Sequence, residues 1–279
     1  MKRSAPDGGY GFGAKCQYRR NIWATFRAKA SAQGFARPDC HVMLMPSIEG
    51  KEIEVAMAAG FRQDKMHVVD GSAGIVADLK KRYRQINTYA VGRPPDGGVK
   101  AAAARIAAKG IRLRFANLDL CGPVSKNLSS ELALFARARC LDDVAYVAVT
   151  MLRGREQQSA SSYLEESFGA KLPSHQLKPS WARVFDGLSE FDVRRQLFIG
   201  GHLAAGGGGE LIDLDITIPI RCETYRSTAG SQTMIWSIWQ VVSNRYAREH
   251  GFLTDSRVKL TTAPVISDLA LMKFTGVAH

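Results

Sequence analysis

The sequence predicts an α/β fold, a three-layer sandwich around a mainly parallel seven-stranded sheet that ends in an antiparallel β-hairpin. Five short apolar runs alternate with helical segments between residues 38 and 151, and this alternation is typical of parallel sheets with right-handed crossovers. A segment with alternating apolar residues, 211–226, and an apolar segment, 232–242, follow with a turn between them, as in an antiparallel hairpin. The chain has 279 residues, 46% of them hydrophobic, which is enough to bury one large domain.

Four strand and helix pairs occupy the first half of the predicted domain, and a fifth strand follows them. The expected strands are residues 41–45, 65–70, 87–91, 111–120 and 144–151, and the expected helices are residues 49–59, 73–85, 99–109 and 125–140. Gly60 and Gly110 stand where two of these helices should end, because glycine accepts the left-handed backbone angles of a helix C-terminus. The fifth strand is a nearly continuous apolar run, as in a central strand that is buried on both faces.

The domain organisation follows from where this alternation breaks. We expect a basic N-terminal extension over residues 1–37 with a helix at 17–33, a domain over residues 38–243, and a C-terminal tail over residues 244–279 that packs on it. A helical insertion at about residues 152–210 contains an expected helix at 181–200 and ends in the glycine run 206–209. Neither Lys-Ser nor Lys-Thr follows that run, which favours a flexible linker over a phosphate-binding loop.

The chain is strongly basic, with 38 Lys and Arg against 26 Asp and Glu, a net charge of +12 and a sequence pI near 9.7. This charge favours binding to polyanions such as RNA or DNA. Basic residues in the first 37 positions are interleaved with the aromatic residues Tyr10, Phe12, Tyr18, Trp23 and Phe26. Two interpretations are open: the rings offer stacking surfaces for unpaired bases, or they pack an amphipathic helix on the core.

Several function classes are excluded by what the sequence lacks. The five cysteines are widely spaced and form no Cys-x-x-Cys pair, so we expect reduced thiols, no disulfide and no metal site. The histidines show no zincin pattern, and neither a Gly-x-Ser-x-Gly nor a P-loop motif is present. No apolar stretch reaches the length of a membrane span and the N-terminus has no apolar signal core, so we expect a cytoplasmic protein without membrane contact.

A polar break at the end of the expected fourth strand is the first candidate for chemistry. Asn117, Asp119 and Cys121 alternate with apolar residues there, and Gly122 with Pro123 ends the strand. In open α/β sheets the carboxyl ends of the strands border the ligand crevice, so polar residues at such an end are candidate functional groups. The alternative is a plain corner in which Asp119 caps the next helix.

The order of the elements resembles that of the class I S-adenosylmethionine-dependent methyltransferases. That superfamily has five β–α units followed by a terminal hairpin whose last strand inserts antiparallel into the parallel sheet, and the resemblance covers residues 38–243. Ordinary dinucleotide dehydrogenases have a sixth parallel strand instead, so the hairpin distinguishes the two. The resemblance implies a Rossmann-like fold and S-adenosylmethionine as the cofactor.

The resemblance also implies a cofactor site. Asp70 ends the second strand, where the superfamily uses an acid to accept hydrogen bonds from the ribose hydroxyls; its alternative role is a cap for the next helix. The Gly-x-Gly-x-Gly motif after the first strand is reduced here to one glycine, and Glu49 in this loop either accepts the cofactor's amino group or is a favourable acid at a helix N-terminus. The residues implied in cofactor binding are Pro46, Ser47, Glu49, Asp70, Gly71, Gly92 and Asn117.

The loop at residues 117–123 is similar to the Asp-Pro-Phe-Gly loop of some tRNA guanine methylases, although Cys121 departs from that pattern and the aromatic residue is missing. The similarity implies that Asp119 and Asn117 are catalytic residues, which accept the hydrogens of an exocyclic amine and aim its lone pair at the methyl group. Cys121 either attacks a pyrimidine ring, as in cytosine-5 methylases, or is a buried passive thiol. The residues implied in substrate binding are Gly122, Pro123, Tyr225 and Arg226.

The function expected from the residues and the resemblance together is a methyltransferase that acts on a base of RNA or DNA. The alternative from another class is a catalytically silent Rossmann-like subunit that binds nucleic acid or protein in a larger assembly. The missing glycines favour this alternative, whereas Asp70 and the hairpin favour the enzyme. A methyltransferase for small molecules or proteins fits the fold equally and is disfavoured by the charge alone.

Overall fold

The computed structural model describes residues 12–46, 48–92, 97–120, 122–153, 158, 160–162, 164, 179–204, 215–226 and 233–250. Its main elements are α1 (Phe12–Ala32), β1 (His41–Leu44), α2 (Lys51–Ala58), β2 (Met66–Asp70), α3 (Ala73–Arg82), β3 (Asn87–Ala90), α4 (Val99–Ala107), β4 (Leu113–Asp119), α5 (Lys126–Arg137), β5 (Leu141–Leu152), α7 (Pro179–Val184), α8 (Glu190–Ala204), β6 (Ile216–Arg226), β7 (Thr233–Val242) and α9 (Asn244–Glu249). Short 3-10 helices, η1 (Arg37–Asp39) and η2 (Gln63–Lys65), precede β1 and β2.

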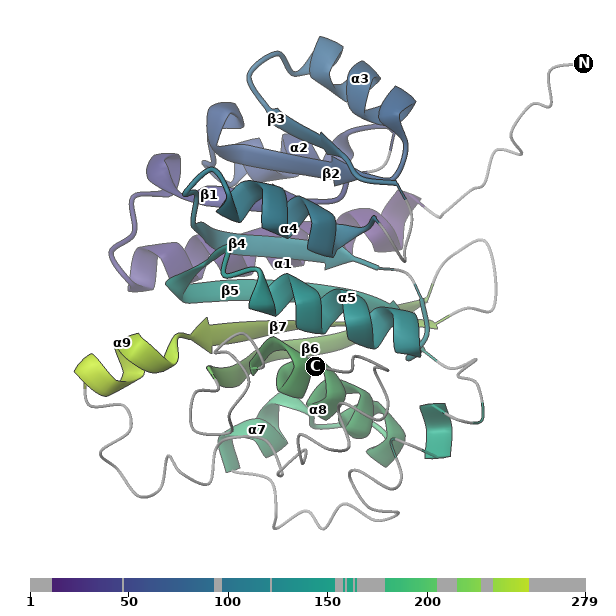
Figure 1. Cartoon of the computed structure of the whole chain (residues 1–279). Helices are drawn as coiled ribbons and strands as arrows, with labels where there is room; N and C mark the ends of the chain where they lie inside the picture. The colour runs from purple at the N-terminus through teal and green to yellow at the C-terminus, as the bar shows by residue number, and fades with distance from the viewer. Residues whose placement is uncertain are drawn as a thin grey trace, which may run out of the picture.

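The strands form one seven-stranded sheet with the order β3-β2-β1-β4-β5-β7-β6. β1 to β5 pair in parallel, whereas β7 lies antiparallel between β5 and β6. Figure 1 shows the strands side by side from β3 to β6, with helices in front of the sheet and behind it. The predicted fold class, a mainly parallel seven-stranded sheet with a terminal antiparallel hairpin, is therefore confirmed. The connection order reverses between β1 and β4, and ligands of open α/β sheets bind at such a point.

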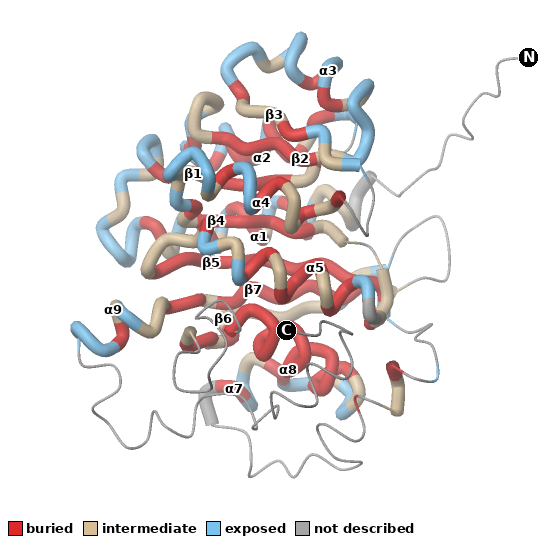
Figure 2. The backbone as a smooth tube through the Cα atoms, viewed as in Figure 1, coloured by how far each residue is buried: buried red, intermediate tan, exposed pale blue. Residues whose placement is uncertain are grey.

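Two hydrophobic clusters cover the two faces of the sheet. α4, α5, α7 and α8 pack on one face, around residues such as Leu118 and Trp239. α1 and α2 pack on the other face, where the ring of Phe26 contacts that of Phe115. Figure 2 shows that most of the strands are buried between these layers, whereas the outer side of α3 is exposed. None of the described helices is long and apolar enough to cross a membrane.

The structure of α1 decides between the two interpretations of the basic N-terminal segment. Tyr18, Trp23 and Phe26 are buried in the core, with exposed fractions of at most 1%. These rings share one side of the helix because they are spaced by about one or two turns. They therefore offer no stacking surface for bases, and that interpretation is wrong for these three residues. Arg20 and Arg27 lie on the exposed side of the same helix.

The helix expected at 181–200 is instead two helices, α7 and α8, which a turn separates. Gly187 in this turn has a φ of +73°, a conformation that only glycine adopts without steric cost. α8 packs on α5 and β6. The expected C-terminal tail begins with α9, whose first turn is capped by the side chain of Ser243. Tyr10, the glycine run 206–209 and residues 251–279 lie outside the described residues.

Candidate functional site at the carboxyl edge of the sheet

A cavity of about 250 Å³ opens at the carboxyl edge of the sheet, where the strand order reverses. Its walls come from the ends of β1 to β4 and the first turns of α4 and α5, and they include the apolar side chains of Val69, Val91 and Leu120. Four predicted residues meet here, namely Gly71, Gly92, Gly122 and Pro123. The structure thus brings two residues predicted for the cofactor together with two predicted for the substrate.

Glu131 of α5 contributes a carboxylate to this cavity. Its Oε2 accepts a hydrogen bond from the backbone N–H of Lys100 at 3.3 Å and so caps the start of α4. Gly98 permits this approach, because a Cβ atom there would lie 2.3 Å from Oε2. The other oxygen, Oε1, is buried and accepts no hydrogen bond from the described residues, and the Lys100 ammonium lies 3.8 Å away. Burial raises the pKa of Glu131 above its ordinary value.

Asp70 ends β2 next to the cavity. Its Oδ1 accepts a hydrogen bond from the backbone N–H of Ser72 at 2.7 Å, and Ser72 in turn caps α3 by accepting from the N–H of Ile75. The alternative role of Asp70 as the cap of α3 is therefore wrong, because Ser72 is the cap. Asp70 instead forms an Asx turn before the helix, which occupies one carboxylate oxygen. The adjacent Gly71 lines the cavity. Asp70 thus lies where a ribose ligand is expected, and that role stays a prediction.

The loop after β1 is held by α3. Arg82 donates hydrogen bonds to the backbone carbonyls of Ile48 and Glu49, the second at 2.9 Å. Gly50 precedes α2 with a φ of +69°, and a Cβ atom there would lie 2.8 Å from the Tyr83 ring. The single glycine of this loop therefore serves the contact between α2 and α3.

The cofactor residues predicted in this loop do not line the cavity. Pro46 is buried, and Glu49 is exposed and forms an ion pair of 3.2 Å with Lys51. Ser47 lies outside the described residues. The expectation that Pro46 and Glu49 meet the same cavity as Gly71 and Gly92 is not met, because the backbone carbonyls of the loop are held against α3.

Asn117 and Asp119 lie on the opposite face of the sheet from the cavity, beneath α1. Together with Lys15, Tyr18 and Arg19 of α1 and Glu52 of α2 they form a polar group that we call the α1 cluster. The Asp119 Oδ2 atom lies 3.1 Å from both the Tyr18 hydroxyl and the Lys15 ammonium. Asn117 donates through Nδ2 to Glu52 Oε1 at 2.5 Å. The two predicted catalytic residues therefore share one face, as side chains two positions apart in a strand must.

The corner alternative for Asp119 is wrong, because another residue caps the next helix. The side chain of Ser125 accepts a hydrogen bond from the N–H of Leu128 at the start of α5. The carboxylate of Asp119 instead faces the α1 cluster. Cys121 lies outside the described residues, so both of its interpretations stay predictions.

Burial dominates the electrostatics of the α1 cluster. It raises the pKa of Glu52 to about 7, against the hydrogen bond from Asn117 and the charge of Arg19. Burial and the negative charge of Asp119 raise the pKa of Tyr18 well above its ordinary value. The charge of Glu52 helps to raise the pKa of Arg19 although burial opposes it, so the guanidinium stays protonated. The α1 cluster thus contains a buried cation, Arg19, and a buried acid that is readily protonated, Glu52.

The two hairpin residues predicted to contact a substrate lie at the end of β6. Tyr225 stacks on Tyr18, with ring centroids 4.7 Å apart and an interplanar angle of 10°. It therefore adjoins the α1 cluster and not the cavity that Gly122 and Pro123 line. Arg226 is exposed.

Sequence reasoning missed Arg19, Glu52 and Glu131, although each interrupts the apolar side of its helix. Arg19 lies one turn before the buried Trp23, Glu131 lies one turn before the buried Phe135, and Glu52 lies on the buried side of α2. Residues spaced by one turn share a helix face, so these charges must point inward. The search for polar residues at strand ends passed over them because they lie within helices.

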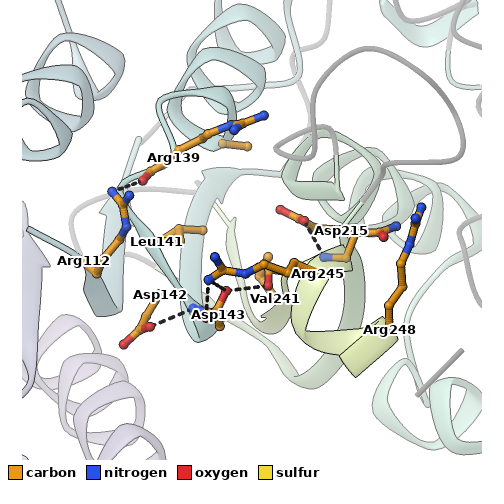
Figure 3. A pocket seen from close by; sticks show the side chains of 12 residues that line it. Arg112, Arg139, Leu141, Asp142, Asp143, Asp215, Val241, Arg245 and Arg248 are labelled. Carbon is orange, nitrogen blue, oxygen red and sulfur yellow. Dashed lines mark hydrogen bonds and ion pairs between the residues drawn. The ribbon is translucent and has the colours of Figure 1, made fainter. Parts of the chain in front are cut away.

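A second hollow, of about 450 Å³, lies at the opposite edge of the sheet, near the start of β5 (Figure 3). Arg245 binds both carboxylate oxygens of Asp143 there, and Arg112 donates to the backbone carbonyl of Arg139. None of the predicted site residues lines it. No group of three or more His, Cys, Asp or Glu among the described residues is placed to hold a metal ion. The carboxyl edge therefore remains the candidate site.

No protein-family model and no curated protein sequence matches the chain. Among solved structures it is similar to 1,6-didemethyltoxoflavin-N1-methyltransferase from Burkholderia thailandensis, at 12% identity and a TM-score of 0.43 over 81% of this chain and 78% of that one. It is also similar to N-methyltransferase NodS from Bradyrhizobium japonicum, at 6% identity and a TM-score of 0.43 over 81% and 96% of the two chains. For TrmN from Thermus thermophilus the identity is 9% and the TM-score 0.39, over 80% and 49%. The described part of this chain has the mainly parallel sheet with an inserted antiparallel last strand that its resemblance to the class I methyltransferases predicts.

Proposed function

We propose that this protein is an S-adenosylmethionine-dependent methyltransferase whose acceptor is a base of RNA or DNA. The observation that carries the proposal is that the cavity, Asp70 and the α1 cluster all lie at one edge of the sheet, where the strand order reverses. In open α/β sheets, nucleotide-like ligands bind at this edge. Bound S-adenosylmethionine would supply an electrophilic methyl group on its sulfonium sulfur.

The cavity fits the adenosine part of this cofactor. Its apolar walls, which include Val69, Val91 and Leu120, suit a flat purine ring. Glu131 Oε1 lies 3.8 Å from the Lys100 ammonium but accepts no hydrogen bond from the described residues. It would accept one from an exocyclic amino group, which would remove a desolvation penalty of about 1–3 kcal/mol. Asp70 would accept hydrogen bonds from ribose hydroxyls through the carboxylate oxygen that Ser72 does not use.

The Asp119 carboxylate is the principal group for the acceptor. It would accept an N–H of an exocyclic amine in exchange for its contact with Lys15 or Tyr18, and so hold the nitrogen lone pair in line with the methyl group. The net charge of +12 supports a polyanionic substrate. Arg27, on the exposed side of α1, would contact phosphates.

Titration calorimetry with S-adenosylhomocysteine tests the cofactor assignment. We expect the wild type to bind, and Glu131→Gln to bind about tenfold more weakly, because its amide can turn an N–H toward the exocyclic amino group. Glu249→Gln, at an exposed position of α9, is the matched control and should bind like the wild type. A wild type that does not bind at high ligand concentration would refute the proposal.

A radiolabelled methyl-transfer screen over total RNA, DNA and protein tests the acceptor. We expect the label in nucleic acid. Asp119→Ala should abolish transfer and leave the affinity for S-adenosylhomocysteine nearly unchanged, since Asp119 does not line the cavity and its carboxylate contacts Tyr18 and Lys15. Full activity of this variant would remove Asp119 from the site, and label in protein alone would contradict a nucleic-acid acceptor.

One observation favours a second candidate, a catalytically silent Rossmann-like subunit that binds nucleic acid or protein. The glycine that the loop after β1 retains, Gly50, packs against Tyr83, where a cofactor-binding loop would use glycine to approach its ligand. The same calorimetry separates the two candidates. A silent subunit would bind RNA or a protein partner and would not bind S-adenosylhomocysteine.

A further inference from the structure

The α1 cluster buries polar atoms that lack partners. Glu52 Oε2, Asn117 Oδ1 and Arg19 Nε form no hydrogen bond with any described residue. The exposed fraction is 0% for Glu52 and Asn117 and 4% for Arg19. Folded proteins pair nearly all of their buried polar groups, so each exception requires an explanation. Three exceptions within one cluster point to a ligand that pairs with them.

The unpaired atoms are of complementary kinds. Glu52 Oε1 accepts from Asn117 Nδ2 at 2.5 Å and from Trp23 Nε1 at 3.3 Å, which leaves Oε2 and the Asn117 carbonyl oxygen as acceptors on two side chains that contact each other. Arg19 on α1 supplies a cationic donor, and its charge and that of Glu52 each shift the other's pKa. No ion pair joins Arg19 to Glu52 in the part of the chain that the structure describes. The cluster thus holds a guanidinium and a carboxyl group that interact electrostatically without forming an ion pair.

We infer that the α1 cluster binds the zwitterionic amino-acid group of the proposed cofactor, with Arg19 paired to its carboxylate and Glu52 and Asn117 accepting the hydrogens of its ammonium. This inference rests on the proposed function and names the residues of this chain for one end of the ligand. An ammonium carries donors alone, which suits two neighbouring oxygen acceptors. A carboxylate suits the planar guanidinium, which is the preferred partner for that group.

The position of the cluster agrees with a ligand that also fills the cavity. Asn117 pairs with Leu44 at the end of β1, and Met45 and Leu120, which follow along the two strands, line the cavity on the other face. A ligand with a nucleoside at one end and an amino-acid group at the other can therefore extend over the edge from the cavity to the α1 cluster. Asp119 keeps its separate contacts with Lys15 and Tyr18 and remains the group for the acceptor.

Two nucleosides that differ at this end provide the test. S-adenosylhomocysteine carries the amino-acid group, and 5′-methylthioadenosine has the same nucleoside and thioether without it. Calorimetry measures both dissociation constants for the wild type, for Glu52→Gln and Arg19→Met, and for Arg20→Met, which changes the exposed neighbour on α1. Thermal unfolding of each variant shows that it is folded. Glu52→Gln replaces the carboxylate with a group of the same shape, so it keeps the test valid where Arg19→Met does not fold.

The inference predicts a difference between the two ligands. Glu52→Gln and Arg19→Met should weaken S-adenosylhomocysteine by about tenfold or more, because each removes a charged partner, and should leave 5′-methylthioadenosine within about twofold. Arg20→Met should leave both ligands unchanged. If the wild type binds both nucleosides equally well, or the variants weaken both equally, the inference is overturned and the proposed function stands. If the wild type binds neither nucleoside, the proposed function itself is overturned.

Discussion

Replacing Glu52 with glutamine should change how the stability of this protein depends on pH. Burial raises the pKa of Glu52 to about 7 in the folded chain, whereas its ordinary value is 4.5. Between these values the folded chain retains a proton that the unfolded chain has released, so the free energy of unfolding falls as the pH rises. The difference between the two pKa values corresponds to a loss of about 3 kcal/mol between pH 4 and pH 8. Glutamine does not titrate, so the variant lacks this loss.

The test uses the difference in the free energy of unfolding between Glu52→Gln and the wild type, because other groups also titrate in both proteins. Burial lowers the pKa of His67 to about 3 and that of His202 to about 4, so the wild type and the variant both lose stability as the pH falls below 6.5, the ordinary histidine value. The new amide N–H of the variant, in place of Oε2, also has no hydrogen-bond acceptor among the described residues, which costs about 1 kcal/mol at every pH. Neither effect changes the pH dependence of the difference.

Urea unfolding at a series of pH values from 4 to 8 measures this difference. We expect the free energy of unfolding of Glu52→Gln, minus that of the wild type, to rise by about 3 kcal/mol across this range. Glu249→Gln, at an exposed position, should follow the wild type throughout. A constant difference between Glu52→Gln and the wild type would show that Glu52 titrates like an exposed carboxyl, and the argument from its burial would then be wrong.

Three further predictions concern the packing of the fold, each measured as the free energy of unfolding in urea. Gly200→Ala should destabilise by about 1–3 kcal/mol, because its Cβ would lie 2.6 Å from the Trp239 ring. Gly74→Ala in α3 should stabilise by about 0.5–1 kcal/mol, because its Cβ would make an ordinary contact of 3.8 Å with the Ser72 hydroxyl. Arg139→Gly should stabilise by about 1 kcal/mol, because the φ of Arg139 is +52°. Gly110→Ala, at a φ of +70°, should destabilise by about as much. Effects of the same sign in the two variants would contradict the argument from the backbone angles. Asp192→Ala should destabilise by about 3–5 kcal/mol, because it removes the buried partner of Arg153 and Arg195, and a neutral effect would show that these ion pairs do not stabilise the fold.

The fold could be predicted from the sequence because its signals are local. Apolar runs of strand length, glycines at helix ends and the alternation at 216–226 each depend on neighbours in the chain, and their order then limits the topology. The two-residue period of a strand also places Asn117 and Asp119 on one face. Which face that is depends on α1, a helix that precedes β1 in the chain and packs beneath the end of β4. The sequence pattern contains no information on that packing, so the division of the site between two faces could not be foreseen.

Pairing, more than burial, distinguishes structural charges from candidate ligand-binding charges in this protein. Asp192 is fully buried, but Ser189, Arg153 and Arg195 bind its carboxylate oxygens, so its charge is compensated within the fold. Among the charged residues that the structure describes, those with a buried side-chain atom that forms no hydrogen bond are Arg19, Glu52 and Glu131. All three lie at the carboxyl edge, on α1, α2 and α5, around the point where the strand order reverses.

A buried polar atom that forms no hydrogen bond destabilises the free protein, even where other atoms of the same side chain have partners. Apolar residues at these three positions would stabilise the fold as well as the charged residues do, or better. The coincidence of all three with the expected ligand edge is therefore explained if a ligand completes their pairing, with an amino group at Glu131 and an amino-acid group between Glu52 and Arg19. The two calorimetric comparisons test the two ends separately. Glu131→Gln should weaken both nucleosides, because both carry the adenine ring, whereas Glu52→Gln should weaken only the ligand with the amino-acid group.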